Sequence, residues 1–253
     1  MGTTNNYDII VVGGGHAGCE AAAAAANLGS QVLLISMDLT KLAQMSCNPA
    51  IGGVGKGQIV REIDALGGYT AKVTDLTTIH FRMLNTSKGA AMWSPRAQCD
   101  RMMFSVEWRK QLESIENLFL LQDEVIKIDI QDQVVKGVFT KSGNYFNAKA
   151  IILTNGTFLN GLIHIGKTSF EGGRIGELPS NGLSDQLREI GFEVGRMKTG
   201  TPARIDGRSI DFSKLIEQKS DLFGKFSFDK DVKSLLKRMS CFIAHTNKAV
   251  HEE

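Results

Sequence analysis

Three glycines near the start of the sequence have the spacing G-x-G-x-x-G, at Gly13, Gly15 and Gly18. In dinucleotide-binding folds the first glycine permits a tight turn, the second lets the backbone approach a pyrophosphate, and the third lets helix and strand pack closely. A helix that begins in such a loop also presents unpaired N–H groups to the phosphates. We therefore predict that the pyrophosphate contacts the whole hexapeptide, which comprises Gly13, Gly14, Gly15, His16, Ala17 and Gly18.

The acidic residue that usually binds the ribose hydroxyls is missing. It should stand at the end of the second strand, which here finishes Ile35-Ser36-Met37-Asp38. Asp38 comes slightly late, and Ser36 offers only a weak substitute. The sequence thus supports nucleotide binding more than ribose recognition.

A second glycine-rich stretch, NPAIGGVGKG, runs from Asn48 to Gly57. A P-loop would need Gly at position 50 and Ser or Thr at position 57, where the chain has Ala50 and Gly57. An ATPase P-loop is therefore excluded. The stretch is expected either to lie against a flavin ring and donate N–H groups, or to be a flexible connector.

Cys47 directly precedes this stretch and is the cysteine with candidate chemistry. A thiol near a helix N-terminus and Lys56 can act as a nucleophile, but a lone cysteine is often structural, and both interpretations stay open. Cys19 and Cys241 are expected to be packing residues, and Cys99 is ambiguous. No cysteines form a C-x-x-C pair and no cluster has zinc spacing, so no metal site is predicted.

Composition narrows the class of protein. A chain of 253 residues with 42% hydrophobic residues can build a substantial core. A net charge of +2 does not by itself argue for nucleic-acid or membrane binding. The longest apolar stretch, around Ala21–Ala26, is too short to span a bilayer. We expect no membrane association and a cytoplasmic, reducing location.

The glycine loop lies in the context that its function requires. Tyr7–Val12 is an apolar run typical of a buried parallel strand, His16–Leu28 is an alanine-rich helix that ends at Gly29, and Gln31–Ser36 is a second buried strand. Strand, loop, helix and strand form a βαβ unit, and this context favours a nucleotide site over a glycine turn without a ligand.

Other elements follow along the chain. The further predicted helices are Gln58–Leu66, Pro95–Ile115 and Leu183–Ile190. The further predicted strands are Leu118–Gln122, Glu124–Ile130, Val134–Thr140, Tyr145–Lys149 and Ala150–Leu153. The pattern of Asp75–Asn85 is ambiguous. The turn after Leu153, Thr154-Asn155-Gly156, is expected to bring backbone back toward the dinucleotide.

Several stretches together resemble one family. They are VVGGGHAGCEAA, MSCNPAIGGVGKGQIVREIDALGG, SPRAQCDR, LTNGTFLNGLIHIG, GGRIGELPS and RMKTGTPARID, and they occur in this order. The sequence resembles the tRNA uridine 5-carboxymethylaminomethyl modification enzymes, the glucose-inhibited division protein A family, over nearly its whole length.

The resemblance implies a flavoenzyme that acts on tRNA. Such proteins bind FAD, reduce it with NADH, and work as homodimers with a partner GTPase on the wobble uridine. Methylenetetrahydrofolate donates the one-carbon unit that is attached to C5 of the base. Because this carbon needs activation, a cysteine that adds at C6 is reasonable chemistry, and Cys47 matches one of the two functional cysteines proposed for the family.

The resemblance also implies site residues. FAD contacts transfer to Gly13 through Gly18, to the Val125 backbone near the adenine, and to Ser180. The residues expected near the flavin or the entering uridine are Asn48, Gly52, Gly53, Lys56, Lys198, Thr199, Gly200 and Arg204. Arg96, Asp100 and Arg101 match a family motif to which we assign no role.

We therefore expect an α/β fold. Residues 1–200 would form a Rossmann-like FAD-binding domain, with a parallel sheet, helices and a β-meander crossover at about 118–149. Residues 201–253 would begin an inserted, β-rich second domain, truncated here because family members are longer. The alternatives are an ordinary small-molecule FAD- or NAD-dependent oxidoreductase and a non-enzymatic nucleotide-binding module. A disulfide oxidoreductase would show paired cysteines near the flavin, and Cys47 is alone.

Overall fold

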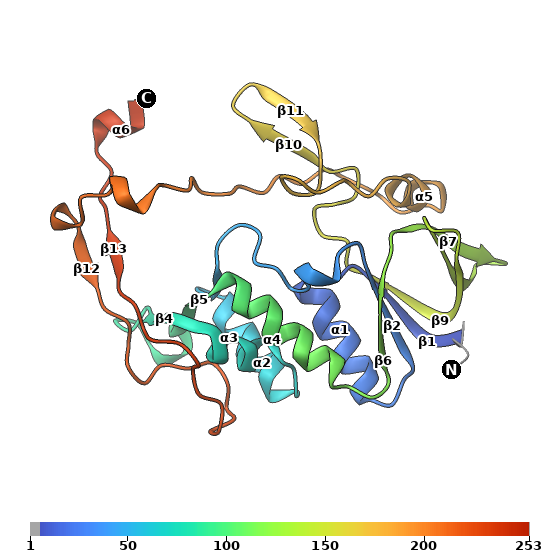
Figure 1. Cartoon of the computed structure of the whole chain (residues 1–253), viewed down its shortest axis with the longest axis horizontal. Helices are drawn as coiled ribbons and strands as arrows, with labels where there is room; N and C mark the ends of the chain where they lie inside the picture. The colour runs from blue at the N-terminus through green and yellow to red at the C-terminus, as the bar shows by residue number, and fades with distance from the viewer. Residues whose placement is uncertain (1–5, 253) are drawn as a thin grey trace.

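The computed structural model describes residues 6–252 and has a six-stranded sheet as its centre (Figure 1). The strand order is β6-β2-β1-β9-β8-β7. The strands are β1 (Asn6–Val12), β2 (Val32–Ser36), β6 (Leu118–Gln122), β7 (Val125–Gln131), β8 (Val134–Thr140) and β9 (Tyr145–Leu153). The chain therefore has the predicted α/β class.

The βαβ unit forms as the sequence predicts. β1 and β2 pair in parallel from Ile9↔Val32 to Val12↔Ile35, and α1 (His16–Asn27) connects them. The alanines of α1 let its axis approach the sheet closely because they carry no larger side chain. Burial of the apolar strand residues on both faces is typical of parallel sheets covered by helices.

The β-meander begins later in the chain than predicted. β6 pairs in parallel with β2 at the far edge of the sheet, so it does not belong to the meander, which begins at β7. The reason is the helix that precedes β6, since a crossover helix returns the chain in parallel orientation. The predicted strands Tyr145–Lys149 and Ala150–Leu153 are one continuous strand, β9, which is antiparallel to β8 and parallel to β1.

The prediction of one helix over Pro95–Ile115 is wrong in its first part. Residues Ser94–Cys99 form β5, and α4 (Arg101–Glu113) starts only after Asp100. Both Met102 and Met103 donate their N–H groups to the Asp100 carboxylate, so this residue caps the helix and fixes its start. β5 is the central strand of a second sheet and is therefore extended despite its weak strand pattern.

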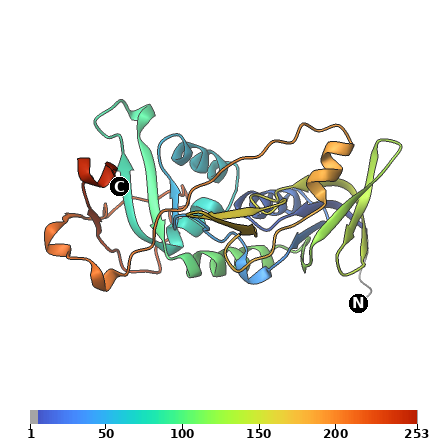
Figure 2. The ribbon, with the colours of Figure 1, turned by 90° about the horizontal axis from the view of Figure 1, so that it is seen from above.

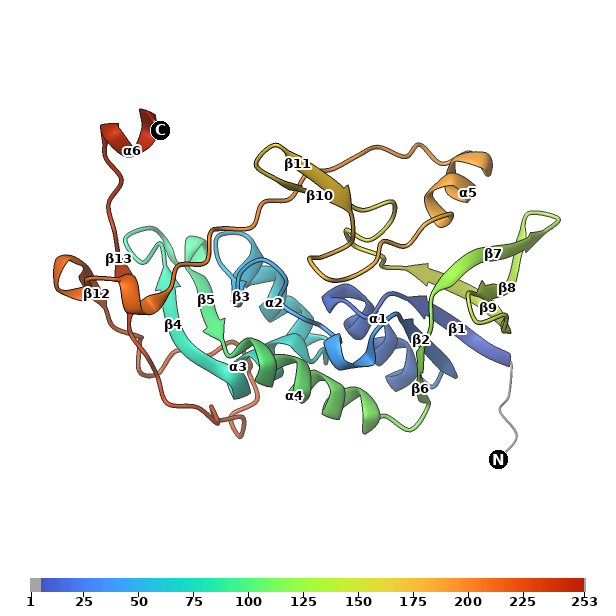
Figure 3. The ribbon, with the colours of Figure 1, turned by 45° about the horizontal axis from the view of Figure 1, so that its top comes forward.

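This second sheet has the order β3-β5-β4 and lies at the opposite end of the molecule from the meander (Figure 3). The ambiguous stretch 75–85 divides between a helix and a strand. The elements of this region are β3 (Ala50–Gly52), α2 (Lys56–Ala65), α3 (Thr70–Thr77) and β4 (Thr78–Leu84).

After α5 the remaining chain runs across the molecule to the end that holds the second sheet (Figures 1 and 3). A hairpin and α5 follow β9, and an extended segment then runs along one side toward the second sheet (Figures 1 and 2). The elements are β10 (Leu162–Ile165), β11 (Thr168–Glu171), α5 (Leu183–Glu189), β12 (Ile216–Gln218), β13 (Cys241–Ile243) and α6 (Lys248–Glu252). Single turns of 3-10 helix are η1 (Leu39–Lys41), η2 (Ala90–Met92), η3 (Gly207–Ser209) and η4 (Phe212–Lys214).

Two buried aspartates attach the returning segment to the helices. Asp75 accepts the N–H groups of Phe226 and Ser227, each at 2.8 Å, and Asp64 accepts the N–H of Phe228 at 2.7 Å. Phe226 is fully buried beside Phe81. A segment more than 140 residues away in sequence therefore packs against α2, α3 and β4.

Among the described glycines, an added Cβ atom would meet its nearest neighbour at Gly18. A Cβ atom there would overlap the Gly13 carbonyl oxygen and would come within 2.7 Å of the Thr154 hydroxyl. Only glycine lets α1 pack this near to the ends of β1 and β9, as the motif predicts.

Gly18→Ala should therefore lower the free energy of unfolding by roughly 1 to 3 kcal/mol, because α1 must shift away from the strand ends. Denaturant titration measures this. Gly89→Ala is the matched control, since a Cβ at Gly89 meets nothing and φ is −58°. Equal stability of the two variants would contradict the packing argument.

Candidate functional site

The glycine loop is held by bonds to three neighbouring segments. Gly13 has a φ of +106° and donates its N–H to the Ile35 carbonyl at the end of β2. The Thr154 hydroxyl, from the turn after β9, lies 2.9 Å from both the Val12 and the Gly13 carbonyl oxygens. This turn thus contacts the loop at which the dinucleotide is expected. The loop is thus preformed at the carboxyl edge of the parallel strands, where open α/β sheets bind ligands.

The space around the loop suits a pyrophosphate. α1 has no acidic residue in its first turn and its N-cap, Gly15, has no side chain to occupy the first N–H groups. A Cβ at Gly15 would meet nothing within 4 Å. The unpaired N–H groups and the positive end of the helix therefore face open space, which is the arrangement that binds phosphates.

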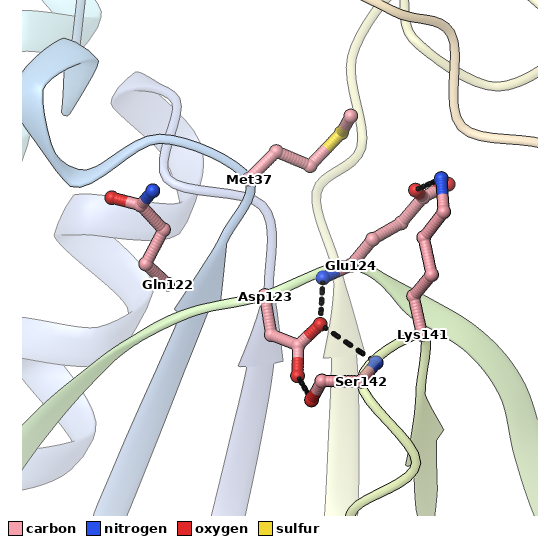
Figure 4. Close-up of a pocket in the computed structure, with 6 residues that line it drawn as sticks. All are labelled: Met37, Gln122, Asp123, Glu124, Lys141 and Ser142. Carbon is pink, nitrogen blue, oxygen red and sulfur yellow. Dashed lines mark hydrogen bonds and ion pairs between the residues drawn. The ribbon is translucent and has the colours of Figure 1, made fainter.

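A cavity of about 380 Å³ opens at the same edge of the sheet (Figure 4). It lies at the ends of β2 and β6, and Met37, the first residue after β2, forms part of its wall. Its lining residues are Met37, Gln122, Asp123, Glu124, Lys141 and Ser142. Val125, whose backbone is expected near an adenine, directly follows this lining as the first residue of β7.

An acidic residue, Asp123, directly follows the strand next to β2 and lines this cavity. Asp38 is engaged elsewhere, since it caps η1 through the Thr40 N–H at 2.8 Å and pairs with Lys41 at 3.1 Å. Asp123 instead faces the cavity from the end of β6. The sequence does show two acidic residues, Asp123 and Glu124, at the end of a predicted strand. It does not show that this strand, β6, lies next to β2, which follows only from the strand order of the sheet.

Asp123 is held in place and kept ionised. It accepts the Glu124 N–H at 2.8 Å and the Ser142 hydroxyl, while Glu124 pairs with Lys141 at 2.7 Å (Figure 4). Burial raises the pKa of Asp123, but the hydrogen bonds from Ser142, Thr140 and the Glu124 backbone outweigh it, so this pKa lies below its usual value. An ionised carboxylate has further acceptor sites for ligand hydroxyls.

A second cavity, of about 470 Å³, lies on the α2 side of the loop. It brings His16 and Ala17 of the glycine loop together with predicted residues of the 48–57 stretch. From that stretch Asn48, Gly52 and Lys56 line it, and Arg96 of β5 does as well. Gly53 does not line it. The 48–57 stretch therefore borders a cavity beside the glycine loop and contains β3.

Cys47 lies beside the predicted 198–204 stretch. The thiol is half-buried and unpaired, and the Thr201 hydroxyl donates to its Sγ at 3.6 Å. The Arg204 guanidinium donates to the Cys47 carbonyl oxygen. Lys198, Thr199 and Gly200 are exposed on the same extended segment. The structure thus brings Arg204 to Cys47, and it adds Thr201, which sequence reasoning missed although it lies in the same motif.

Two further predicted residues, Ser180 and His16, make contacts within the protein. Ser180 is buried and exchanges backbone hydrogen bonds with Phe158 and Asn160. His16 packs with its ring centroid 5.6 Å from that of Phe104. Burial lowers the pKa of His16, although hydrogen bonding to the Ala43 and Gln44 backbone opposes this. His16 is therefore packed within the protein, and its neutral form is favoured.

The chain matches a known protein family. Residues 8–253 match the sequence profile of the family described as glucose inhibited division protein A. The chain belongs to this family. Among the described residues no group of acidic, histidine or cysteine side chains can hold a metal ion, and no helix has the length and apolar character to cross a membrane.

Relatives agree with this membership. The tRNA uridine 5-carboxymethylaminomethyl modification enzyme MnmG of Parabacteroides distasonis is 59% identical over 98% of the chain, and that of Cytophaga hutchinsonii is 58% identical over 97%. The chain spans 40% of the length of both. The crystal structure of Aquifex aeolicus GidA (form II) is 45% identical and superposes with a TM-score of 0.90, covering 96% of this chain and 41% of that one. The Rossmann-like fold is therefore confirmed.

The environment of His16 predicts a pH dependence of stability. The folded-state pKa is below the ordinary 6.5, so the unfolded chain binds the proton first as the pH falls. The native state should therefore lose stability below about pH 6.5, down to the folded-state pKa. His16→Asn should lose less stability than the unsubstituted chain between about pH 7.5 and about pH 5, in urea titrations. The exposed His245→Asn is the control, and an identical pH profile for all three proteins would refute the assignment.

Proposed function

We propose that the chain is the FAD-binding part of a tRNA-modifying flavoenzyme. The single observation that carries this is the preformed glycine loop with a cavity on each side. The loop would hold the pyrophosphate, and the cavity around Asp123 would take the adenosine half, with the Asp123 carboxylate accepting ribose hydroxyls. The cavity bordered by Asn48, Gly52 and Lys56 would take the flavin half.

The family membership supports a reaction on the wobble uridine of tRNA. When bound, FAD would supply the redox chemistry, with NADH as reductant and methylenetetrahydrofolate as carbon donor. The name of the relatives, a tRNA uridine modification enzyme, supports RNA as substrate. We further infer a homodimer that works with a partner GTPase in the cytoplasm, on the strength of the same resemblance.

Cys47 is the residue that we assign to covalent activation of the uridine. Its thiolate would add to C6, and the C5–C6 electron pair would then be available at C5 to bond the one-carbon unit. Loss of the C5 proton and expulsion of the thiolate would restore the ring. The Thr201 hydroxyl would orient Sγ, and Arg204 would fix the Cys47 backbone.

A small-molecule FAD- or NAD-dependent oxidoreductase is the alternative. It would need the same glycine loop but no nucleophile beside the 198–204 segment. The lone, half-buried Cys47, whose carbonyl oxygen accepts a hydrogen bond from the Arg204 guanidinium, favours an anionic nucleic-acid substrate over a disulfide or a neutral metabolite.

Gly15→Glu tests the cofactor assignment. The new side chain enters open space and a carboxylate suits a helix N-terminus, so the fold should persist. Its charge would stand where the pyrophosphate is expected, and FAD affinity should fall at least about a hundredfold. Flavin fluorescence titration measures this. Gly15→Gln, of the same length without the charge, should bind much more tightly, and equal affinities would refute the loop's role.

Cys47→Ala tests the nucleophile in the longer protein to which this sequence aligns. Modification of the wobble uridine should stop while FAD remains bound, because the thiol lies outside both cavities. Mass spectrometry of tRNA nucleosides from cells lacking the enzyme, complemented with each variant, provides the readout. Cys241→Ala serves as control, and unchanged modification by Cys47→Ala would rule out an essential nucleophile.

A further inference from the structure

The extended segment between α5 and η3 has few attachments to the rest of the molecule (Figure 1). We call its residues 193–205 the strap. All of them except Val194 are exposed. No backbone group of the strap is hydrogen-bonded to another described backbone group, and none of its side chains forms an ion pair with a described residue. A segment with so few buried contacts opens locally at little cost in free energy.

Three side chains attach the strap by hydrogen bonds. The Arg204 guanidinium donates to the Cys47 carbonyl oxygen, and the Thr201 hydroxyl donates to the Cys47 Sγ at 3.6 Å. The Arg196 guanidinium donates to the Asn160 carbonyl oxygen at 3.4 Å. Two of the three attachments therefore end on Cys47, which is half-buried in this arrangement.

The partners of both arginines are neutral oxygens. An ionised oxygen binds a guanidinium more strongly than a carbonyl oxygen does, and a phosphate can accept two parallel N–H groups at once. Lys198, which lies between the two arginines in the sequence, is exposed and also has no carboxylate partner among the described residues. A phosphate that reaches the strap would therefore compete with the Cys47 carbonyl oxygen for Arg204.

The strap has room to move away from Cys47. An added Cβ at Gly195 would meet nothing within 4 Å, and neither would one at Gly200, so close packing restrains neither glycine. The side chain of Met197 is 97% exposed and that of Ile205 is 70% exposed. Opening would thus expose little additional apolar surface, and glycines increase the number of conformations that the released chain can adopt.

We propose that the strap closes over Cys47 while Arg204 is bonded to the Cys47 carbonyl oxygen, and that a nucleic-acid phosphate opens it by taking that guanidinium. This rests on the proposed function, which supplies the nucleic-acid substrate and the role of Cys47. In the closed resting state Thr201 orients the Sγ atom and the thiol stays half-buried. In the open state the thiol is accessible to a base, so the nucleophile is uncovered where substrate phosphates have bound.

Alkylation of Cys47 by the neutral reagent iodoacetamide, located by peptide mass spectrometry, measures the opening in the 253-residue chain. Arg204→Gln should speed this alkylation about three- to tenfold, because it removes an attachment of the strap. Arg208→Gln is the matched control, since Arg208 is exposed and pairs with Asp206 at 2.6 Å. Unchanged or slower alkylation in Arg204→Gln would overturn the proposal. A fixed strap gives that result, because loss of a positive charge does not favour the reactive thiolate.

Gly195→Ala changes the same measurement in the opposite direction. It should slow alkylation of Cys47 about two- to fivefold, because an added methyl group restricts the released chain more than the closed one. Alkylation as fast as in the unsubstituted chain would show that the strap does not control access to the thiol.

Inorganic phosphate tests the release. When it replaces chloride at constant ionic strength, it should speed alkylation of Cys47 in the Arg208→Gln control and leave the rate in Arg204→Gln unchanged. An unchanged rate in the control would overturn release by phosphate.

An RNA hairpin with an unpaired uridine identifies the source of the phosphate. It should bind Arg204→Gln more weakly than the control, and the slope of log affinity against log salt should fall by about 0.7 for the lost contact. If inorganic phosphate opened the strap but the hairpin bound neither protein, the proposed nucleic-acid substrate would fail and the strap would respond to free phosphate. If the hairpin bound both variants equally, the strap would not be its contact, and the present proposal alone would fail.

Discussion

The contact between the Gly18 backbone and the ends of β1 and β9 is the constraint on which the site depends. Because neither Gly13 nor Gly18 carries a side chain, α1 starts directly against the strand ends, and Thr154 ties the two strands to the loop. This geometry points the free N–H groups of α1 outward. A larger residue would move the helix and with it the cavity walls formed by His16 and Ala17.

The sequence predicts the elements whose secondary structure follows from their own pattern of apolar residues and glycines. The βαβ unit follows from apolar runs separated by glycines, and the helix predicted over Leu183–Ile190 forms as α5, which ends at Glu189. The strand Ser94–Cys99 was not predictable in this way, because its extended form comes from pairing with β3 and β4 and not from its own composition. For the same reason the sequence does not show that Asp123, which follows β6, lies beside the end of β2.

The second glycine-rich stretch depends on a distant part of the chain. Its Gly52 has a φ of +85°, and a Cβ there would overlap the ring of Phe226. Asp75 and Asp64 hold this phenylalanine and its neighbours by their N–H groups. The segment that begins beyond residue 200 therefore supports the wall of one cavity and, through Thr201 and Arg204, also reaches Cys47. Residues that are far apart in the sequence therefore come together around the second glycine-rich stretch and Cys47.

The central claim is that this chain has one FAD site built on the glycine loop, with the adenosine half beside Asp123. Calorimetric titration of the unsubstituted chain with FAD, repeated in the presence of excess ADP, tests it most directly. We predict one FAD per chain and competition by ADP, since both ligands would place an adenosine and a diphosphate in the same positions. Absence of FAD binding, or FAD binding that ADP does not weaken, would contradict it.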